Sequence, residues 1–230
     1  MRKDLYIIVE GETELEFLNR ILIPYLYKKG LQNHIQSVLV TMSGGGHGFN
    51  NIAHFKNTIK PILSYQNEPF ITTMIDHYGI NSEKKLPNYA ICIEKNTVEE
   101  RILCMEENLN QVVQSIKPYP FFVPNIIQHE METLLFANPE VGFELEDDAI
   151  KKAVVKLSQQ FERIEDINSN PETAPSKRLE KIYLDNKQKY KKVADAIDIA
   201  ELTGIETILE KCPRFRNWVE KIIALFENNL

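Results

Sequence analysis

Residues 5–11 read LYIIVEG, and this segment decides the fold class of the 230-residue chain. Five consecutive aliphatic and aromatic residues are typical of a strand that is buried on both faces, as in a parallel sheet. The run ends at Glu10-Gly11, and from about Thr13 apolar residues recur at three- and four-residue spacing, which predicts an amphipathic helix. The segment therefore predicts the first strand and the first helix of an α/β fold.

The same alternation continues through the first half of the chain. Strand patterns occupy residues 34–41, 70–76 and 121–127, and helical patterns occupy residues 51–64 and 97–116. Strands separated by helices at this spacing predict right-handed crossovers within one parallel sheet. After Asn138 the strand signals stop and the remainder is helical in pattern. We therefore predict a small parallel sheet flanked by helices over residues 1–138, and a helical C-terminal region over residues 139–230 packed on it.

The composition excludes several classes of protein. A hydrophobic content of 43% argues against intrinsic disorder, and 33 acidic against 27 basic residues exclude a uniformly basic nucleic-acid coat. Cys92, Cys104 and Cys212 show no C-x-x-C spacing, so we expect neither a disulfide framework nor a zinc site, but small core residues in a reducing compartment. No apolar stretch is long enough for a signal peptide or a membrane span. We expect a soluble cytoplasmic protein that does not bind a membrane.

Acidic side chains follow two of the predicted strands. Glu10 comes after the first strand and Asp76 after the third, at the sheet edge where parallel α/β proteins bind ligands. Glu14 lies one helical turn beyond Glu10 and can point into the same pocket. Three converging carboxylates repel one another unless Mg²⁺ or Mn²⁺ neutralises them, so the pattern predicts a metal site. The alternative is that the glutamates cap a helix and that Asp76 is a turn residue.

A family resemblance supports the metal site. Residues 7–14 (IIVEGETE) resemble the first motif of the Toprim fold, which DnaG-type primases, topoisomerases, the nuclease that matures 5S ribosomal RNA and the overcoming-lysogenization-defect nucleases share. The resemblance implies acid–base or metal chemistry for Glu10, and metal binding by an Asp-x-Asp motif that begins at Asp76. Tyr78 stands where the second aspartate of that motif is expected, which puts the site in doubt.

A second resemblance covers most of the chain. It is carried by residues 9–11 (VEG), 73–79 (TMIDHYG), 128–136 (QHEMETLLF), 175–179 (PSKRL) and 212–215 (CPRF). These segments resemble an uncharacterised bacterial family of Toprim-like proteins, known only as a domain of unknown function. Its members are often associated with ATPases of the ABC or AAA type in suspected defence loci. The resemblance implies a Toprim-like fold and an ATPase partner.

Glu130 and Glu132 follow the fourth strand and are candidates to replace the missing aspartate as metal ligands. They come after His129, which is a candidate proton-transfer group. The alternative is that both glutamates occupy the first turn of an amphipathic helix, with His129 near its cap.

Positive charge is concentrated in residues 175–192, where seven basic and two acidic side chains give a net +5. Lys177, Arg178 and Lys181 have the spacing of one helix face, which suits phosphate groups. Lys177 or Arg178 is a candidate to stabilise charge on a scissile phosphate. The alternative is an ordinary solvated face.

The sequence thus predicts a Toprim-fold nuclease that uses Mg²⁺ or Mn²⁺ to hydrolyse DNA or RNA, as the effector of a bacterial defence system. Its metal ligands are predicted to be Glu10, Glu14 and Asp76, assisted by Glu130 or Glu132. The competing hypothesis is a non-catalytic or regulatory subunit that docks onto an ABC- or AAA-type ATPase. The sequence leaves open whether the substrate is DNA or RNA, and whether the chain forms a homodimer.

Overall fold

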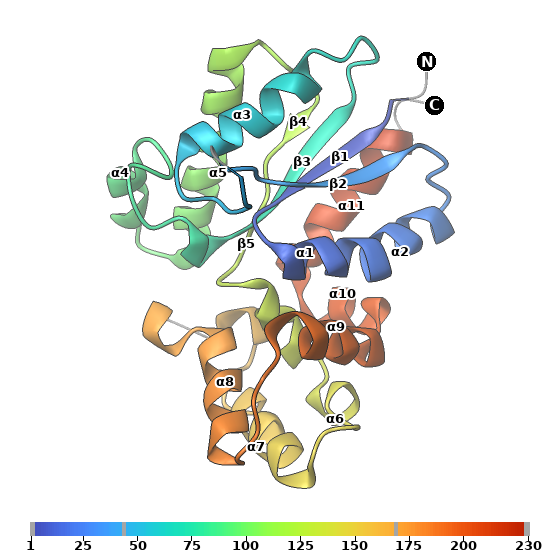
Figure 1. Cartoon of the computed structure of the whole chain (residues 1–230), viewed down its shortest axis with the longest axis vertical. Helices are drawn as coiled ribbons and strands as arrows, with labels where there is room; N and C mark the ends of the chain where they lie inside the picture. Colours follow the sequence, from blue (N-terminus) through green and yellow to red (C-terminus); the bar gives the residue numbers. More distant parts are fainter. Residues whose placement is uncertain (1–2, 43–44, 168–169, 228–230) are drawn as a thin grey trace. The chain divides into compact units, whose positions relative to one another are not determined.

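The computed structural model describes residues 3–42, 45–167 and 170–227, which divide into two compact units (Figure 1). Of the described residues, the first unit holds 3–15 and 30–128 and is here called the sheet unit. The second holds 16–29 and 129–227 and is called the helical unit. The division differs from a single boundary after Asn138, because residues 16–29 and 129–138 belong to the helical unit.

The sheet unit is built on the parallel sheet that the sequence predicts. Its strands are β1 (Leu5–Val9), β2 (Ile35–Leu39), β3 (Phe70–Asp76), β4 (Phe122–Val123) and β5 (Ile126–Ile127). The order is β2-β1-β3-β4, β5 also pairs with β3, and every pairing is parallel. All five residues of β1 are buried, as expected for a strand covered on both faces. The predicted fourth strand is two short strands, because Pro124 lacks the N–H that a continuous ladder needs.

Helices α3 (Ile52–Leu63), α4 (Tyr89–Ile93) and α5 (Val98–Ile116) lie on one face of this sheet (Figure 1). Ile8 and Ile71 from the sheet join Phe55 of α3 and Met105 of α5 in one buried apolar cluster. The start of α5 has a capping box, in which the Thr97 and Glu100 side chains each accept a hydrogen bond from the other residue's backbone N–H group. The stretch between β3 and α5, which has no helical pattern in the sequence, contains α4 and a 3-10 turn, η2 (His77–Gly79).

The helical unit confirms the predicted helical C-terminal region. Its elements are the end of α1 (Glu12–Phe17), a π-helical turn (Leu18–Leu22), α2 (Ile23–Lys28), 3-10 helix η3 (Met131–Phe136), α6 (Pro139–Gly142), α7 (Asp148–Ser158), 3-10 turns at Ile164–Asp166 and Pro171–Thr173, α8 (Pro175–Asp185), α9 (Lys192–Thr203), α10 (Ile205–Lys211) and α11 (Pro213–Glu227). Its core includes Trp218 and an edge-to-face contact of Phe17 with Phe215. None of the helices in the described part of the chain is long and apolar enough to cross a membrane.

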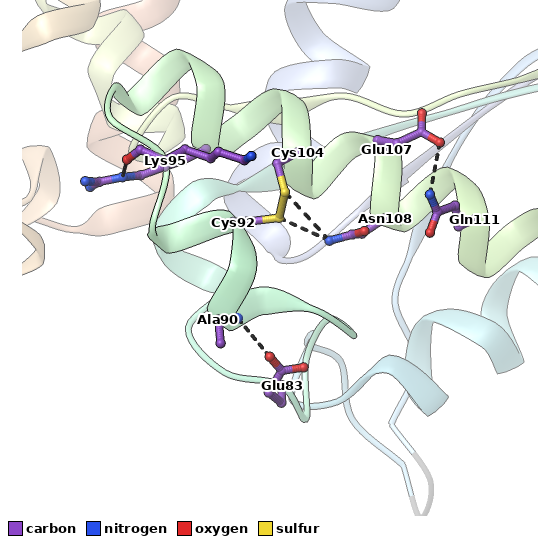
Figure 2. Close-up of a disulfide and its surroundings, with 9 residues drawn as sticks. Glu83, Ala90, Cys92, Lys95, Cys104, Glu107, Asn108 and Gln111 are labelled. Atoms are coloured by element: carbon purple, nitrogen blue, oxygen red, sulfur yellow. Dashed lines mark hydrogen bonds between the residues drawn. A yellow bond between two sulfur atoms is a disulfide. The ribbon is translucent and has the colours of Figure 1, made fainter.

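Cys92 of α4 and Cys104 of α5 form a disulfide, so the prediction that they are reduced core residues is wrong (Figure 2). The pairing follows from α4, a short helix that sequence periodicity does not reveal and that packs against α5. The amide nitrogen of Asn108, one turn beyond Cys104, lies 3.1 Å from the Cys92 sulfur. Cys212 is free and buried, as predicted. Cysteine usage therefore gives no argument for a reducing compartment.

The disulfide closes a loop of sequence separation 12. Restricting such a loop in the unfolded chain is worth about 3 kcal/mol of stability. We expect a reducing agent to lower the melting temperature of the wild-type protein measured by calorimetry. The variant with both Cys92→Ser and Cys104→Ser should melt lower than the oxidised wild type and should not respond to the reductant. Equal melting temperatures for wild type with and without reductant would contradict the pairing.

Candidate functional site

The chain crossovers diverge at the carboxyl ends of β1 and β3. From β1 the chain continues to β2, toward one edge of the sheet. From β3 it continues to β4, toward the opposite edge. Such a switch point opens a crevice beyond the strand ends, where ligands of open α/β sheets bind. Val9, the last residue of β1, pairs with Met74, and Glu10 follows directly after it. Asp76 is the last residue of β3. The structure therefore places both acids at the edge that the sequence analysis predicts for them.

Glu10 is half-buried and its carboxylate lies against Gly79 in the turn after β3. A β-carbon built on Gly79 would lie 2.1 Å from Glu10 Oε2. The same glycine is bonded on its other side, since Lys85 Nζ donates a hydrogen bond of 2.6 Å to the Gly79 carbonyl oxygen. The structure thus adds Gly79 and Lys85 to the surroundings of Glu10. Neither was found from the sequence, because the stretch that holds Lys85 has no periodicity and the glycine has no motif of its own.

Glu14 is buried, and its Oε2 accepts a hydrogen bond of 2.9 Å from the Gly11 N–H. Gly11 directly precedes α1, whose first turn also carries Glu12. A glutamate at the third helical position that reaches back to the residue before the helix forms half of a capping box. This geometry is the one that the capping alternative expects for Glu14.

The turn after Asp76 carries two stacked rings where the Toprim motif has its second acid. His77 and Tyr78 have ring centroids 5.3 Å apart at an interplanar angle of 28°. Asp76 itself is 9% exposed. Across the described ranges, no three His, Cys, Asp or Glu side chains form a group that could surround a metal ion.

Glu130 and Glu132 belong to the helical unit, and both have partners there. Glu130 Oε2 accepts a hydrogen bond of 3.0 Å from the Ser176 N–H at the start of α8. Glu132 is fully buried, and its Oε1 lies 3.3 Å from Lys192 Nζ at the start of α9. Each acid therefore offers negative charge to the beginning of a helix or to a lysine there, which is a structural arrangement. Lys192 could not be predicted as a partner of Glu132, because nothing in the sequence spacing relates the two residues.

A second fully buried acid of the helical unit, Glu165, has no sequence signature. Its two carboxylate oxygens accept hydrogen bonds of 3.0 Å from the N–H groups of Arg214 and Phe215, in the first turn of α11. Burial raises the pKa of Glu165, while these two bonds and nearby arginines act in the opposite direction. Because Pro213 supplies no N–H, these are the first donors of the helix. Glu165 is therefore a capping residue supplied from a distant part of the chain.

His129 is 1% exposed and has a backbone φ of 65°. Burial lowers the pKa of His129 to about 4, and a hydrogen bond with the main chain of Glu165 opposes part of that shift. Segments 128–136, 175–179 and 212–215, which carry the family resemblance, are thus linked through His129, Glu130 and Glu165. Residues of the segments that carry the family resemblance therefore make structural contacts with one another inside the helical unit.

The basic side chains of α8 differ in their contacts and in their exposure to solvent. Arg178 Nε donates a hydrogen bond of 2.8 Å to the Thr173 carbonyl oxygen, and its guanidinium lies 5.7 Å from the centre of the Phe161 ring. Lys177 is exposed and pairs with Glu180 at 2.9 Å. Lys181 is also exposed. The two lysines are the accessible cations of this face, whereas Arg178 supports the structure around the start of α8.

Residues 9–223 match the family model of a domain of unknown function (DUF4276), and the chain belongs to this family. The match begins at the last residue of β1 and runs into α11, so it includes both the carboxyl edge of the sheet and the three linked segments of the helical unit. No curated protein and no solved structure matches the chain.

The buried neutral state of His129 makes stability depend on pH. The unfolded chain gains a proton near pH 6.5, whereas folded His129 gains one only near pH 4. The unfolded state therefore binds more protons between these values, so stability is complete above pH 6.5 and falls as the pH decreases, by about 3 kcal/mol in total. Urea unfolding across this range measures the loss.

His129→Asn should flatten that pH dependence, because asparagine tolerates the left-handed backbone without titrating. His34→Asn is the control, since His34 is exposed. An unchanged slope in His129→Asn would show that another group causes the loss.

Proposed function

We propose that this member of the DUF4276 family is a Toprim-like, metal-dependent phosphodiesterase that hydrolyses DNA or RNA at the carboxyl edge of its sheet. The observation that supports the proposal best is the position of Glu10 and Asp76 at the switch point between β1 and β3. Open α/β sheets bind ligands at this position, and two carboxylates there can hold one divalent cation together with water and substrate.

The donor set fits a hard divalent cation. Glu10 and Asp76 offer carboxylate oxygens, and Mg²⁺ is commonly held by one or two carboxylates together with water and substrate phosphate. A dedicated cage of three protein ligands is therefore not required. When bound, such an ion supplies an activated water and neutralises charge on the phosphate. In this scheme Asp76 holds the ion, and Glu10 holds it or accepts the proton of the attacking water.

The other acids take structural roles in this proposal. Glu14 caps the start of α1, and Glu130 supports the start of α8. Glu132 pairs with Lys192 and remains fully buried. We therefore place the metal on Glu10 and Asp76 alone, fewer ligands than the sequence pattern suggests.

Nucleic acid is the proposed substrate because α8 presents accessible cations in a chain of net charge −6. Lys177 and Lys181 are exposed and suited to contact a phosphate backbone. Arg178 is tied to Thr173 and contributes by holding the start of the helix. Binding of this kind reads charge rather than base sequence, so sequence preference is expected to be slight.

A second function is favoured by one observation in the site. Tyr78, stacked on His77, occupies the position of the second acid in the Toprim motif. A sheet edge with one acid fewer fits a regulatory subunit that assembles with an ABC- or AAA-type ATPase instead of cutting nucleic acid. Ile91 and Ile93 of α4 and Leu103 of α5 are exposed apolar residues of the sheet unit that such assembly can cover.

Glu10→Gln preserves the size of the side chain but removes its charge and its use as a base. We expect Mn²⁺-dependent cleavage of DNA or RNA to fall by about 10²-fold or more in this variant. Asp76→Asn should weaken Mn²⁺ binding measured by calorimetric titration. Glu12→Gln is the matched control, because Glu12 is exposed in the first turn of α1 and should retain full activity.

The cleavage assay should also include the complex with any ABC- or AAA-type ATPase encoded beside the gene, since a nuclease that such a partner regulates would be inactive by itself. Wild type and Glu10→Gln that are equally inactive in that complex, with metal and nucleotide supplied, would end the nuclease proposal. Retained assembly of both proteins would then favour the regulatory subunit.

Reversing the accessible charge of α8 tests the nucleic-acid surface. Lys177→Glu combined with Lys181→Glu should weaken binding to single- and double-stranded probes, and the wild-type affinity should fall steeply as salt rises. Lys187→Glu with Lys189→Glu is the control, because both lysines are exposed and lie beyond the end of α8. Equal loss in both double variants, measured by fluorescence anisotropy, would show that only net charge matters.

A further inference from the structure

We propose that Gly79 is a positioning residue for Glu10, and that Lys85 holds Gly79 in the place where it does so. The inference rests on the proposed function for its consequence, because it concerns where the carboxylate of Glu10 is presented. It assigns a role to the turn after β3 that neither the Toprim resemblance nor the family match provides.

The close approach at Gly79 is a matter of space. A β-carbon on Gly79 would lie 2.1 Å from Glu10 Oε2, 3.0 Å from its Cδ and 3.1 Å from its Oε1. All three atoms of the carboxylate therefore lie on the side of Gly79 where any other residue carries its side chain. The glycine is absent from the residues with positive φ, so its backbone conformation is one that other residues adopt. Gly79 is needed because the carboxylate occupies the room of a side chain.

This arrangement couples two strands of the sheet through one side chain. Glu10 follows β1, and Gly79 closes the turn that follows β3. The Oε2 atom of Glu10 is buried, so it has a defined position and does not sample solvent freely. A methyl group at position 79 would displace the end of a flexible side chain while the backbone stays in place. Gly79→Ala is therefore expected to move the carboxylate and to preserve the fold.

Lys85 fixes the turn from its other side. Its half-buried side chain donates the 2.6 Å hydrogen bond to the Gly79 carbonyl oxygen. A charged donor makes this bond stronger than one between neutral groups. The neighbouring Lys84 provides a comparison, since its side chain is exposed and its carbonyl oxygen accepts a hydrogen bond from the Ile52 N–H. Substituting Lys84 leaves that main-chain bond intact.

The first test observes the Glu10 carboxyl group directly, without any activity. In protein labelled with ¹³C at glutamate carboxyl carbons, Glu10→Gln identifies the Glu10 resonance by its disappearance. Gly79→Ala should shift that resonance, and Lys85→Met should shift it in part, whereas Lys84→Met should not. Gly142→Ala is the control for a crowded glycine, because a β-carbon there would lie 2.4 Å from Thr203 Oγ1 within the helical unit. An unmoved Glu10 resonance in folded Gly79→Ala would overturn the inference.

The second test measures the consequence by titrating Mn²⁺ alone. Gly79→Ala should weaken Mn²⁺ affinity about tenfold, a typical effect of changing a residue that orients a metal ligand. In a Glu10→Ala background the same substitution should have no further effect, because Gly79 acts through Glu10. Additive losses in the double variant would overturn the positioning role.

The two tests distinguish a failure of the proposed function from a failure of the role assigned to Gly79. A wild-type protein that binds no Mn²⁺ would contradict the proposed function, while the carboxyl resonance would still decide the role of Gly79. Conversely, Mn²⁺ bound equally by wild type and Gly79→Ala would leave the proposed function standing and remove Gly79 from the site.

Discussion

The parallel pairing of β1 with β3, in the register that sets Val9 opposite Met74, determines what lies at the carboxyl edge of the sheet. A one-residue shift of that register would turn every side chain of β1 to the opposite face, where these buried residues would meet different neighbours in a close-packed core. The register is therefore strongly fixed. The crossovers leave in opposite directions at this point, which is the arrangement at which open α/β sheets bind ligands. Glu10 and Asp76 owe their position to these two constraints together.

Acidic residues serve two different purposes in this chain. In the helical unit, Glu130 and Glu165 accept hydrogen bonds from backbone N–H groups at the starts of α8 and α11. Such groups have no partner inside their own helix, and a carboxylate satisfies them while also interacting favourably with the helix dipole. A buried carboxylate that lacked such donors would be strongly destabilising, so each of these acids is balanced by the element it caps. Glu10 differs, because its carboxylate lies against a glycine in a turn.

The sheet and its long helices could be predicted because strand burial and helix amphipathicity leave periodic patterns. Pro124 even marks the place where the fourth strand divides. The short helix α4 could not be predicted, since five residues contain too little of a helical period, and the disulfide of Cys92 with Cys104 was missed for the same reason. Glu10 and Asp76 were found because strand ends are visible in a sequence. Gly79 and Lys85 were not, because their importance arises from contacts across 69 and 6 residues of chain, for which a single sequence holds no signal.

The charge balance at the sheet edge bears on how an edge with Tyr78 in place of a second aspartate could suit the proposed metal-dependent reaction. Two carboxylates with Lys85 bonded to the same turn carry less negative charge than three carboxylates alone. Repulsion among the acids without a bound cation is then smaller than in a cluster of three carboxylates. A cation held by only two carboxylates keeps coordination positions for water and for a phosphate oxygen. In the function proposed above, such an edge would bind its metal most tightly with a substrate phosphate present, so the missing acid would shift part of the metal affinity from the protein to the nucleic acid.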